Sequence, residues 1–506
     1  MDFPWLTTIG VLPLVGVVAV LVAPKSLARV ITLATSLVTL AAGIAMAVRF
    51  DVGDAGTQQF TETHQWIPQF GVSYALGVNG IGLTMVLLSV VLVPVCVLAA
   101  WNEVEEERAP IFFALILALE TFMVGVFAAR DVFLFYVLFE AMLIPVYFLI
   151  GSFGGAQRRY AAVKFLLYSL LGGLVMLVGV VGVYIAGPGG SDGFLIDKLT
   201  GLDYSSASTE RLLFLAFFFA FAVKAPMWPV HTWLPDAAAE APPAVSVLLV
   251  GVLDKVGTFG MLTLCLPMFP GASKWAAPVI VALAVVSVIY GGLLAIGQKD
   301  LLRLIAYTSV SHFGFIVLGV FSLTSTSQNG STLYMVNHGF STAALFLIAG
   351  MLIRRRGSAR IDEYGGLQRA VPLLAGTFLV AGLSSLALPG LSSFVSEVLV
   401  LIGSYQRYPG ATVVATAGII LAALYILLTY QRMFTGPKRE YSGGWKDLDK
   451  REAWVVAPLL AVILAVGFYP KPVLDVLNPA VQQTVQQTGA SDPAPAVADD
   501  ATGGSK

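Results

Sequence analysis

The stretch from Arg211 to Glu240 reads RLLFLAFFFAFAVKAPMWPVHTWLPDAAAE. Its first half is almost entirely apolar, as expected of a helix in a lipid bilayer. Lys224, Pro226 and Pro229 then interrupt it, and proline both removes a backbone donor and clashes with the preceding turn of a helix. Backbone that unwinds at membrane depth is tolerated only where protein or a water-filled cavity satisfies it. The stretch therefore predicts a membrane helix that breaks beside a buried lysine, followed by a short helix that ends near Glu240.

The whole chain has the composition of a membrane protein. Of its 506 residues, 57% are hydrophobic and 12% are charged, whereas soluble domains carry about 25% charged residues. A bilayer core needs roughly 20 apolar residues per helix, so we predict an all-α polytopic membrane protein of about fourteen transmembrane helices. The approximate spans are 4–22, 28–48, 77–100, 110–128, 132–150, 163–186, 211–225, 243–265, 276–296, 303–322, 331–352, 372–403, 411–434 and 452–470. The first span is interpreted as a retained helix, because the residues before it lack a basic region.

Two sets of five spans resemble each other. Spans seven and twelve are both predicted to be broken helices, the second at Pro389 and Gly390. Asp131 and Asp300 precede the second span of each set. A tyrosine also stands four positions before a basic residue in each third span, and the pairs are Tyr160 with Lys164 and Tyr334 with His338. Since five is odd, the sets run in opposite directions. This predicts the inverted repeat of many transporters, whose ion sites lie near the midplane.

This pattern divides the chain into five parts. We expect three N-terminal helices in 1–109, the first five-helix repeat in 110–266 and the inverted second repeat in 267–434. A cytoplasmic loop and the last transmembrane helix follow in 435–478. Residues 479–506 are rich in Pro, Ala, Asp, Gly and Ser, a composition that predicts a disordered tail.

Basic residues in the loops predict the orientation. The cluster Arg354-Arg355-Arg356 and the loop 432–451 carry much of the positive charge, which places them on the cytoplasmic side and both termini on the outside. Abundant Ala, Val and Gly favour a bacterial plasma (inner) membrane.

Ionisable residues recur inside the predicted spans. A charge at the bilayer centre costs about 2.5–3.5 kcal/mol on insertion scales, so these residues need partners or water. They are either satisfied pairs between helices or a path for protons, and their recurrence in both repeats favours the path. The candidates are Glu140, Lys164, Lys224, Lys255, His312, His338 and Glu397.

Several other chemistries lack their signatures. Cys96 and Cys265 form no CxxC pair, which argues against an iron–sulfur cluster. No GxGxxG or GxxxxGK[ST] motif opens a βαβ unit, so no nucleotide site is expected. We predict no metal site, although haem ligation by His312 and His338, on neighbouring spans, remains an alternative.

Three segments carry a resemblance to a known family. They are KAPMWPVHTWLPD at 224–236 with EAPP at 240–243, QKDLLRLIAYTSVSH at 298–312, and LPGLSSFVSE at 388–397. These motifs resemble the antiporter-like membrane subunits of the proton-pumping NADH:quinone oxidoreductase, respiratory complex I. Glu397 stands where sister subunits carry lysine, which is similar to the branch called subunit M, or chain 4.

The resemblance implies a proton relay. Glu140 and Lys224 would form a modulating pair, and Lys255 would be the central relay lysine. His312 and His338 would link the two halves. Glu397 would be the terminal proton carrier toward the outside, and Lys164 is a lesser candidate. Two positions depart from the family pattern. Ala238 stands where histidine is common, and Asp254 stands where leucine is usual.

The resemblance also implies partners. No cofactor is expected in this chain, and FMN, iron–sulfur clusters and quinone are expected in partner subunits, with antiporter-like subunits as membrane neighbours. The rival functions are the large subunit of a multisubunit sodium/proton antiporter, the membrane arm of a hydrogenase, and a quinone- or haem-binding redox enzyme.

Overall fold

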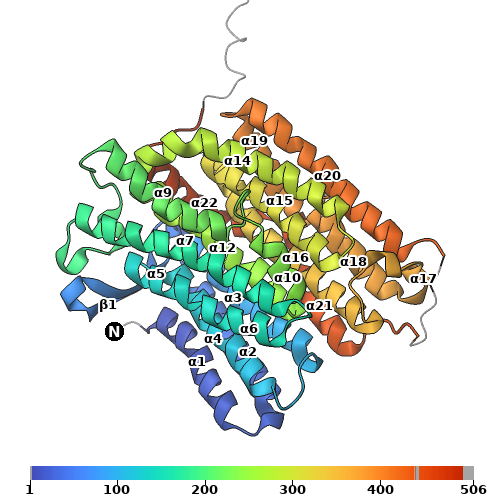
Figure 1. Ribbon diagram of the computed structural model, residues 1–506. Coiled ribbons are helices and arrows are strands. Elements are labelled where there is room, and N and C mark those ends of the chain that lie inside the picture. Colours follow the sequence, from blue (N-terminus) through green and yellow to red (C-terminus); the bar gives the residue numbers. More distant parts are fainter. Residues whose placement is uncertain (1–2, 438, 440–443, 494–506) are drawn as a thin grey trace, which may run out of the picture.

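The computed structural model describes residues 3–437, 439 and 444–493. It is a bundle of helices with one small hairpin (Figure 1). Within the described ranges, twelve helices are long and apolar enough to cross a membrane. The main helices are α1 (Trp5–Val22), α2 (Ala28–Arg49), α3 (Gly80–Ala99), α4 (Ala109–Ala128), α5 (Val132–Ala141), α6 (Leu143–Phe153), α7 (Arg158–Ala186), α9 (Ala207–Lys224), α10 (Trp233–Glu240), α11 (Pro243–Leu248), α12 (Asp254–Gly260), α14 (Pro270–Gly297), α15 (Leu301–Phe321), α16 (Ser325–Arg356), α18 (Pro372–Ser385), α19 (Ser392–Tyr405), α20 (Pro409–Phe434), α21 (Lys450–Phe468) and α22 (Lys471–Gln487).

Both predicted breaks are present. Helix α9 ends at Lys224 and α10 begins at Trp233, while α18 ends at Ser385 and α19 begins at Ser392. The four pieces stand outside the twelve long helices, so the count of fourteen remains a prediction. Gly390 in the second break has a φ of 91°, a left-handed conformation that glycine adopts without a steric penalty.

The repeat is visible in the caps of α5 and α15. Asp131 accepts hydrogen bonds from the backbone at the start of α5, and Asp300 does so at the start of α15. Asp131 also forms an isolated β-bridge with Leu195, in the segment after α7. Asp300 forms one with Arg360, in the segment after α16. Burial raises the pKa of both aspartates, and backbone donors oppose the rise. Five crossings of the bundle separate the two caps, so they lie on opposite faces, as an inverted repeat requires.

A two-stranded hairpin is absent from the predicted all-α fold. Strand β1 (Gln59–Ile67) pairs antiparallel with β2 (Val72–Val78) just before α3. Glu62 on β1 accepts hydrogen bonds from the backbone of Leu6 (2.9 Å) and Thr7 (3.2 Å), so the hairpin caps the start of α1. We call the side of the bundle that carries this hairpin and Asp131 the hairpin face.

The predicted disordered tail is wrong at its beginning. Residues 471–487 form α22, which packs against α3 and α16. Leu477, Val481 and Val485 are buried, and their spacing of four residues places them on one helical face. The polar composition concealed this apolar stripe. The part of the predicted tail in 494–506 lies outside the described residues.

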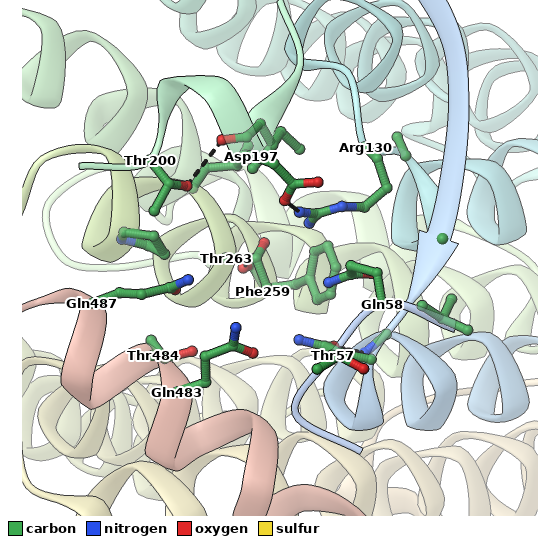
Figure 2. A pocket seen from close by; sticks show the side chains of 18 of the residues that line it. Thr57, Gln58, Arg130, Asp197, Thr200, Phe259, Thr263, Gln483, Thr484 and Gln487 are labelled. Carbon is green, nitrogen blue, oxygen red and sulfur yellow. Dashed lines mark hydrogen bonds and ion pairs between the residues drawn. The ribbon is translucent and has the colours of Figure 1, made fainter. Parts of the chain in front are cut away.

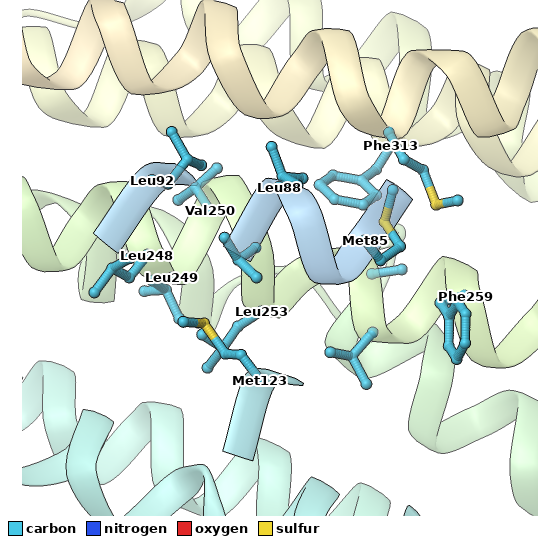
Figure 3. Close-up of a cluster of buried hydrophobic side chains, with 14 of the residues drawn as sticks. Met85, Leu88, Leu92, Met123, Leu248, Leu249, Val250, Leu253, Phe259 and Phe313 are labelled. Carbon is cyan, nitrogen blue, oxygen red and sulfur yellow. The ribbon is translucent and has the colours of Figure 1, made fainter. Parts of the chain in front are cut away.

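The core is built around the helix that carries Lys255. All residues of the span Pro243–Met268 except Pro243 and Thr263 are buried inside the protein, and most of α15 and α16 is buried as well. Apolar side chains from α3, α4 and α15 lie beside those of this span in the buried cluster (Figure 3). This span contains two π-helical turns, Leu249–Leu253 and Met261–Cys265, and such turns are frequent at functional sites. The three most buried spans therefore carry three of the predicted relay residues, Lys255, His312 and His338.

Candidate functional site

The centre of the site is a contact between the two repeats. The ammonium nitrogen of Lys255 lies 2.7 Å from Nδ1 of His338, and it donates a hydrogen bond of 2.6 Å to the carbonyl of Val250 in the first π-helical turn. Both side chains have no solvent exposure. Lys255 also lies over the ring of Phe313, at 5.1 Å from the centroid. The structure thus brings the predicted central lysine and one linking histidine into direct contact.

The second histidine continues the line. The rings of His312 and His338 are 5.2 Å apart between centroids. Nε2 of His312 lies 3.2 Å from the hydroxyl of Tyr425 on α20. Because one nitrogen of each ring contacts a lysine or a tyrosine, these contacts favour a hydrogen-bonded relay over haem ligation.

Glu397 ends the line on α19. Its carboxylate accepts a hydrogen bond of 2.9 Å from the hydroxyl of Tyr334, and the ring centroids of Tyr334 and His312 are 5.8 Å apart. Asn337 donates a hydrogen bond of 2.7 Å to the carbonyl of Ser392 at the second break. The broken helix therefore holds the terminal carboxylate beside the histidines through side chains of α16.

The first repeat contributes Lys224 and Glu140. Lys224 is 1% exposed, and its ammonium group lies 4.9 Å from the ring centroid of Phe139. Within the described chain, no ion pair joins it to Glu140, although the two charges interact electrostatically. The carboxylate of Glu140 lies against Gly173 of α7. The predicted pair is therefore not a direct contact.

Lys164 belongs to a different cluster. Its ammonium group lies 2.7 Å from Asp236 on α10, whose other oxygen accepts from Arg303 of α15 at 2.6 Å. The three side chains are 15–36% exposed. This network joins α7, α10 and α15 beside the first break, near the face opposite the hairpin. Sequence reasoning named Lys164 and missed the other two members of the network, Asp236 and Arg303.

Two buried carboxylates were missing from the candidates. Glu120 on α4 and Asp254 on α12 have no solvent exposure, and none of their oxygens has a hydrogen-bond partner among the described residues. Each stands inside an apolar run, where an ionisable residue is costly enough to need a reason. That signal was visible in the sequence for both residues.

A polar cavity opens near the hairpin face (Figure 2). It has a volume of about 260 Å³, and Arg130 and Asp197 form an ion pair at its edge. Phe259 and Thr263 line it, one and two helical turns beyond Lys255. This cavity brings polar side chains toward the central lysine from that face.

Comparison with known proteins agrees with this architecture. A sequence model of the family described as "NADH:quinone oxidoreductase/Mrp antiporter, TM" matches residues 129–423. NADH-quinone oxidoreductase subunit M of Mycobacterium tuberculosis is 48% identical, over 98% of this chain and 97% of its own. NADH-ubiquinone oxidoreductase chain 4 of Marchantia polymorpha is 38% identical, over 94% of this chain and 96% of its own.

A solved structure agrees as well. A chain of respiratory complex I from Thermus thermophilus superposes with a TM-score of 0.87 at 30% identity, covering 96% of this chain and 100% of that chain. Sequence and structure thus point to one family over nearly the full length. The chain belongs to the NADH:quinone oxidoreductase/Mrp antiporter transmembrane family, in its subunit M or chain 4 branch.

Proposed function

We propose that the chain translocates protons in the membrane arm of an NADH:quinone oxidoreductase. The observation that carries the proposal is the contact of Lys255 with His338. Nearby, the ring of His312 contacts the Tyr425 hydroxyl, and Glu397 accepts a hydrogen bond from the Tyr334 hydroxyl. Each of these groups exchanges a proton, and each is held inside the protein core. A line of this kind across a membrane is typical of proton relays.

The proposed transfer runs from the first repeat to the second. Lys255 passes a proton to Nδ1 of His338 along their 2.7 Å contact, and the ring then releases a proton from Nε2. That nitrogen is buried and has no partner in the described part of the protein, so a water molecule is required between it and His312. Tyr334 and Tyr425 then lead toward Glu397, which delivers the proton toward the hairpin face.

The first repeat regulates when Lys255 gains or loses its proton. Lys224 and Glu140 lie close enough to interact but form no ion pair, so a small side-chain movement alters their interaction. A change in the charge felt by Lys255 then favours loading or release of its proton. The network of Lys164, Asp236 and Arg303 holds the broken helix in place and serves as a positioning element.

The proposal extends to partners and location. We place FMN, iron–sulfur clusters and quinone in partner subunits, and other antiporter-like subunits beside this chain in a bacterial plasma membrane, with both termini outside. Helices α1 and α2 are 28% buried, which leaves apolar surface for lipid or for such neighbours. A sodium/proton antiporter and a hydrogenase arm are less well supported, because relatives at 38–48% identity are named as oxidoreductase subunits.

The test is proton pumping by the reconstituted complex. Lys255→Met removes the ammonium group at similar volume, and we expect pumping coupled to NADH oxidation to fall while the complex still assembles. Electron transfer from NADH to an artificial acceptor should be unchanged, because it does not pass through this chain. Normal pumping by the assembled variant contradicts the proposal, and pumping that depends on sodium favours the antiporter alternative.

A further inference from the structure

Asp254 is a buried carboxylate that the proposed relay has not used. It has no solvent exposure, and both of its oxygens are without hydrogen-bond partners among the described residues. A buried charge without compensation is strongly unfavourable, so its presence requires a reason.

The packing of α12 places Asp254 on the face toward Lys224. Gly257 is one helical turn further along the same face, and a Cβ atom at Gly257 would lie 2.6 Å from the backbone nitrogen of Ala225. Ala225 directly follows Lys224 at the end of α9. The face of α12 that carries Asp254 is therefore packed against the first break.

Lys255 leaves α12 in a different direction. Successive residues of an α-helix are about 100° apart around the axis, and Lys255 reaches His338 on α16. Asp254 interacts electrostatically with both Lys224 and Lys255, but it forms an ion pair of 4.0 Å or less with neither in the described chain. The carboxylate thus stands between the lysine of the broken helix and the lysine of the central contact.

We propose that Asp254 is the carboxylate that relays protons between Lys224 and Lys255, a role that rests on the proposed proton translocation. The ammonium group of Lys224 gives a proton to the Asp254 carboxylate, which leaves a neutral amine and a carboxylic acid. The acid then gives that proton to the neutral amine of Lys255, which restores the carboxylate. Water or a side-chain rotation closes each gap, and no electron is transferred.

The alternative is a permanently protonated carboxyl group that only fills space. Glu120 provides the matched control, because it is equally buried and also without partners, while no charged side chain acts on it. A relay group must change its protonation state during turnover, whereas a space-filling acid has no such requirement.

The experiment measures protons pumped per electron by reconstituted complex that carries Asp254→Asn, Asp254→Leu, Asp254→Glu or Glu120→Gln. We expect at least a tenfold loss of coupled pumping in the Asn and Leu variants, partial activity in the Glu variant, and normal pumping in Glu120→Gln. Infrared difference spectra between resting and working complex should also lose a carboxyl band in Asp254→Asn and keep it in Glu120→Gln.

Three results overturn the proposal. The first is normal pumping in the Asn or Leu variant. The second is failure of all three Asp254 variants to assemble, because that indicates a structural role. The third is a loss of pumping in Glu120→Gln as large as in Asp254→Asn. Lys255→Met, measured in parallel, distinguishes failure of the proposed role of Asp254 from failure of the proposed proton translocation. If Lys255→Met abolishes pumping while Asp254→Leu pumps normally, only the role of Asp254 fails; if Lys255→Met also pumps normally, the proposed function fails.

Discussion

Lys255 and His338 meet at 2.7 Å although they stand in different repeats of the chain. Their contact is a direct polar connection between the first repeat, which carries Lys224 and Glu140, and the second, which carries Glu397. Because both side chains are fully buried, bulk water does not screen this contact. A perturbation of either side chain should therefore be felt in both halves.

His338→Gln should disable the link. Glutamine keeps a polar side chain but does not take up and release a proton near neutral pH. We expect coupled proton pumping to fall by at least about tenfold, since groups that transfer protons typically contribute more than that. The matched control is His64→Gln on the exposed hairpin, which should pump normally. Equal pumping by both variants in proteoliposomes contradicts a relay through His338.

Glu140 and Lys224 should behave as one unit. Glu140→Ala and Lys224→Ala each remove half of an electrostatic pair, so each should strongly lower coupled activity in complex that still assembles. The double variant should be no worse than the single ones, because both changes disable the same unit. If the effects of the two changes are additive in a double-mutant cycle, Glu140 and Lys224 do not act as one unit.

Gly173→Ala should displace Glu140 without removing it. A Cβ atom at this position would overlap Oε1 of Glu140, so the carboxylate must move. The end of a flexible side chain moves at low cost, and we expect normal assembly with reduced coupled activity. Gly376→Ala on α18 is the control, since its added methyl group meets no described atom within 4 Å beyond its chain neighbours and the nearby backbone of its own helix. Wild-type pumping by Gly173→Ala shows that the carboxylate position is unimportant.

Glu397→Gln and Tyr334→Phe test the terminal step at different strengths. Glu397→Gln removes the titrating group at nearly constant volume and should greatly reduce pumping per electron. Tyr334→Phe removes one hydroxyl of the proposed path together with its 2.9 Å hydrogen bond. A water molecule can bridge the gap that it leaves, so pumping should fall less than in Glu397→Gln. A larger effect for Tyr334→Phe than for Glu397→Gln places the essential group on the tyrosine instead.

The sequence by itself determined the features that depend on local physics. Apolar length identifies the membrane helices, because each must satisfy its own backbone within the bilayer. Pro226 and Pro389 mark the two broken helices, because proline in a helix interior removes a backbone donor and clashes with the preceding turn. The ionisable residues inside the spans were equally visible, because lipid makes each of them costly. The resemblance of three short motifs then identified the family.

Only the tertiary structure decided which of these residues meet. Lys255 contacts His338 across 83 positions of the chain, and Lys164 contacts Asp236 across 72; no local pattern selects such partners, because they follow from how helices pack side by side. The π-helical turns that orient Lys255, and the docking of α22 on α3 and α16, are likewise products of packing. Sequence supplied the charged groups inside the membrane helices, and the arrangement of the helices decided which of them lie together.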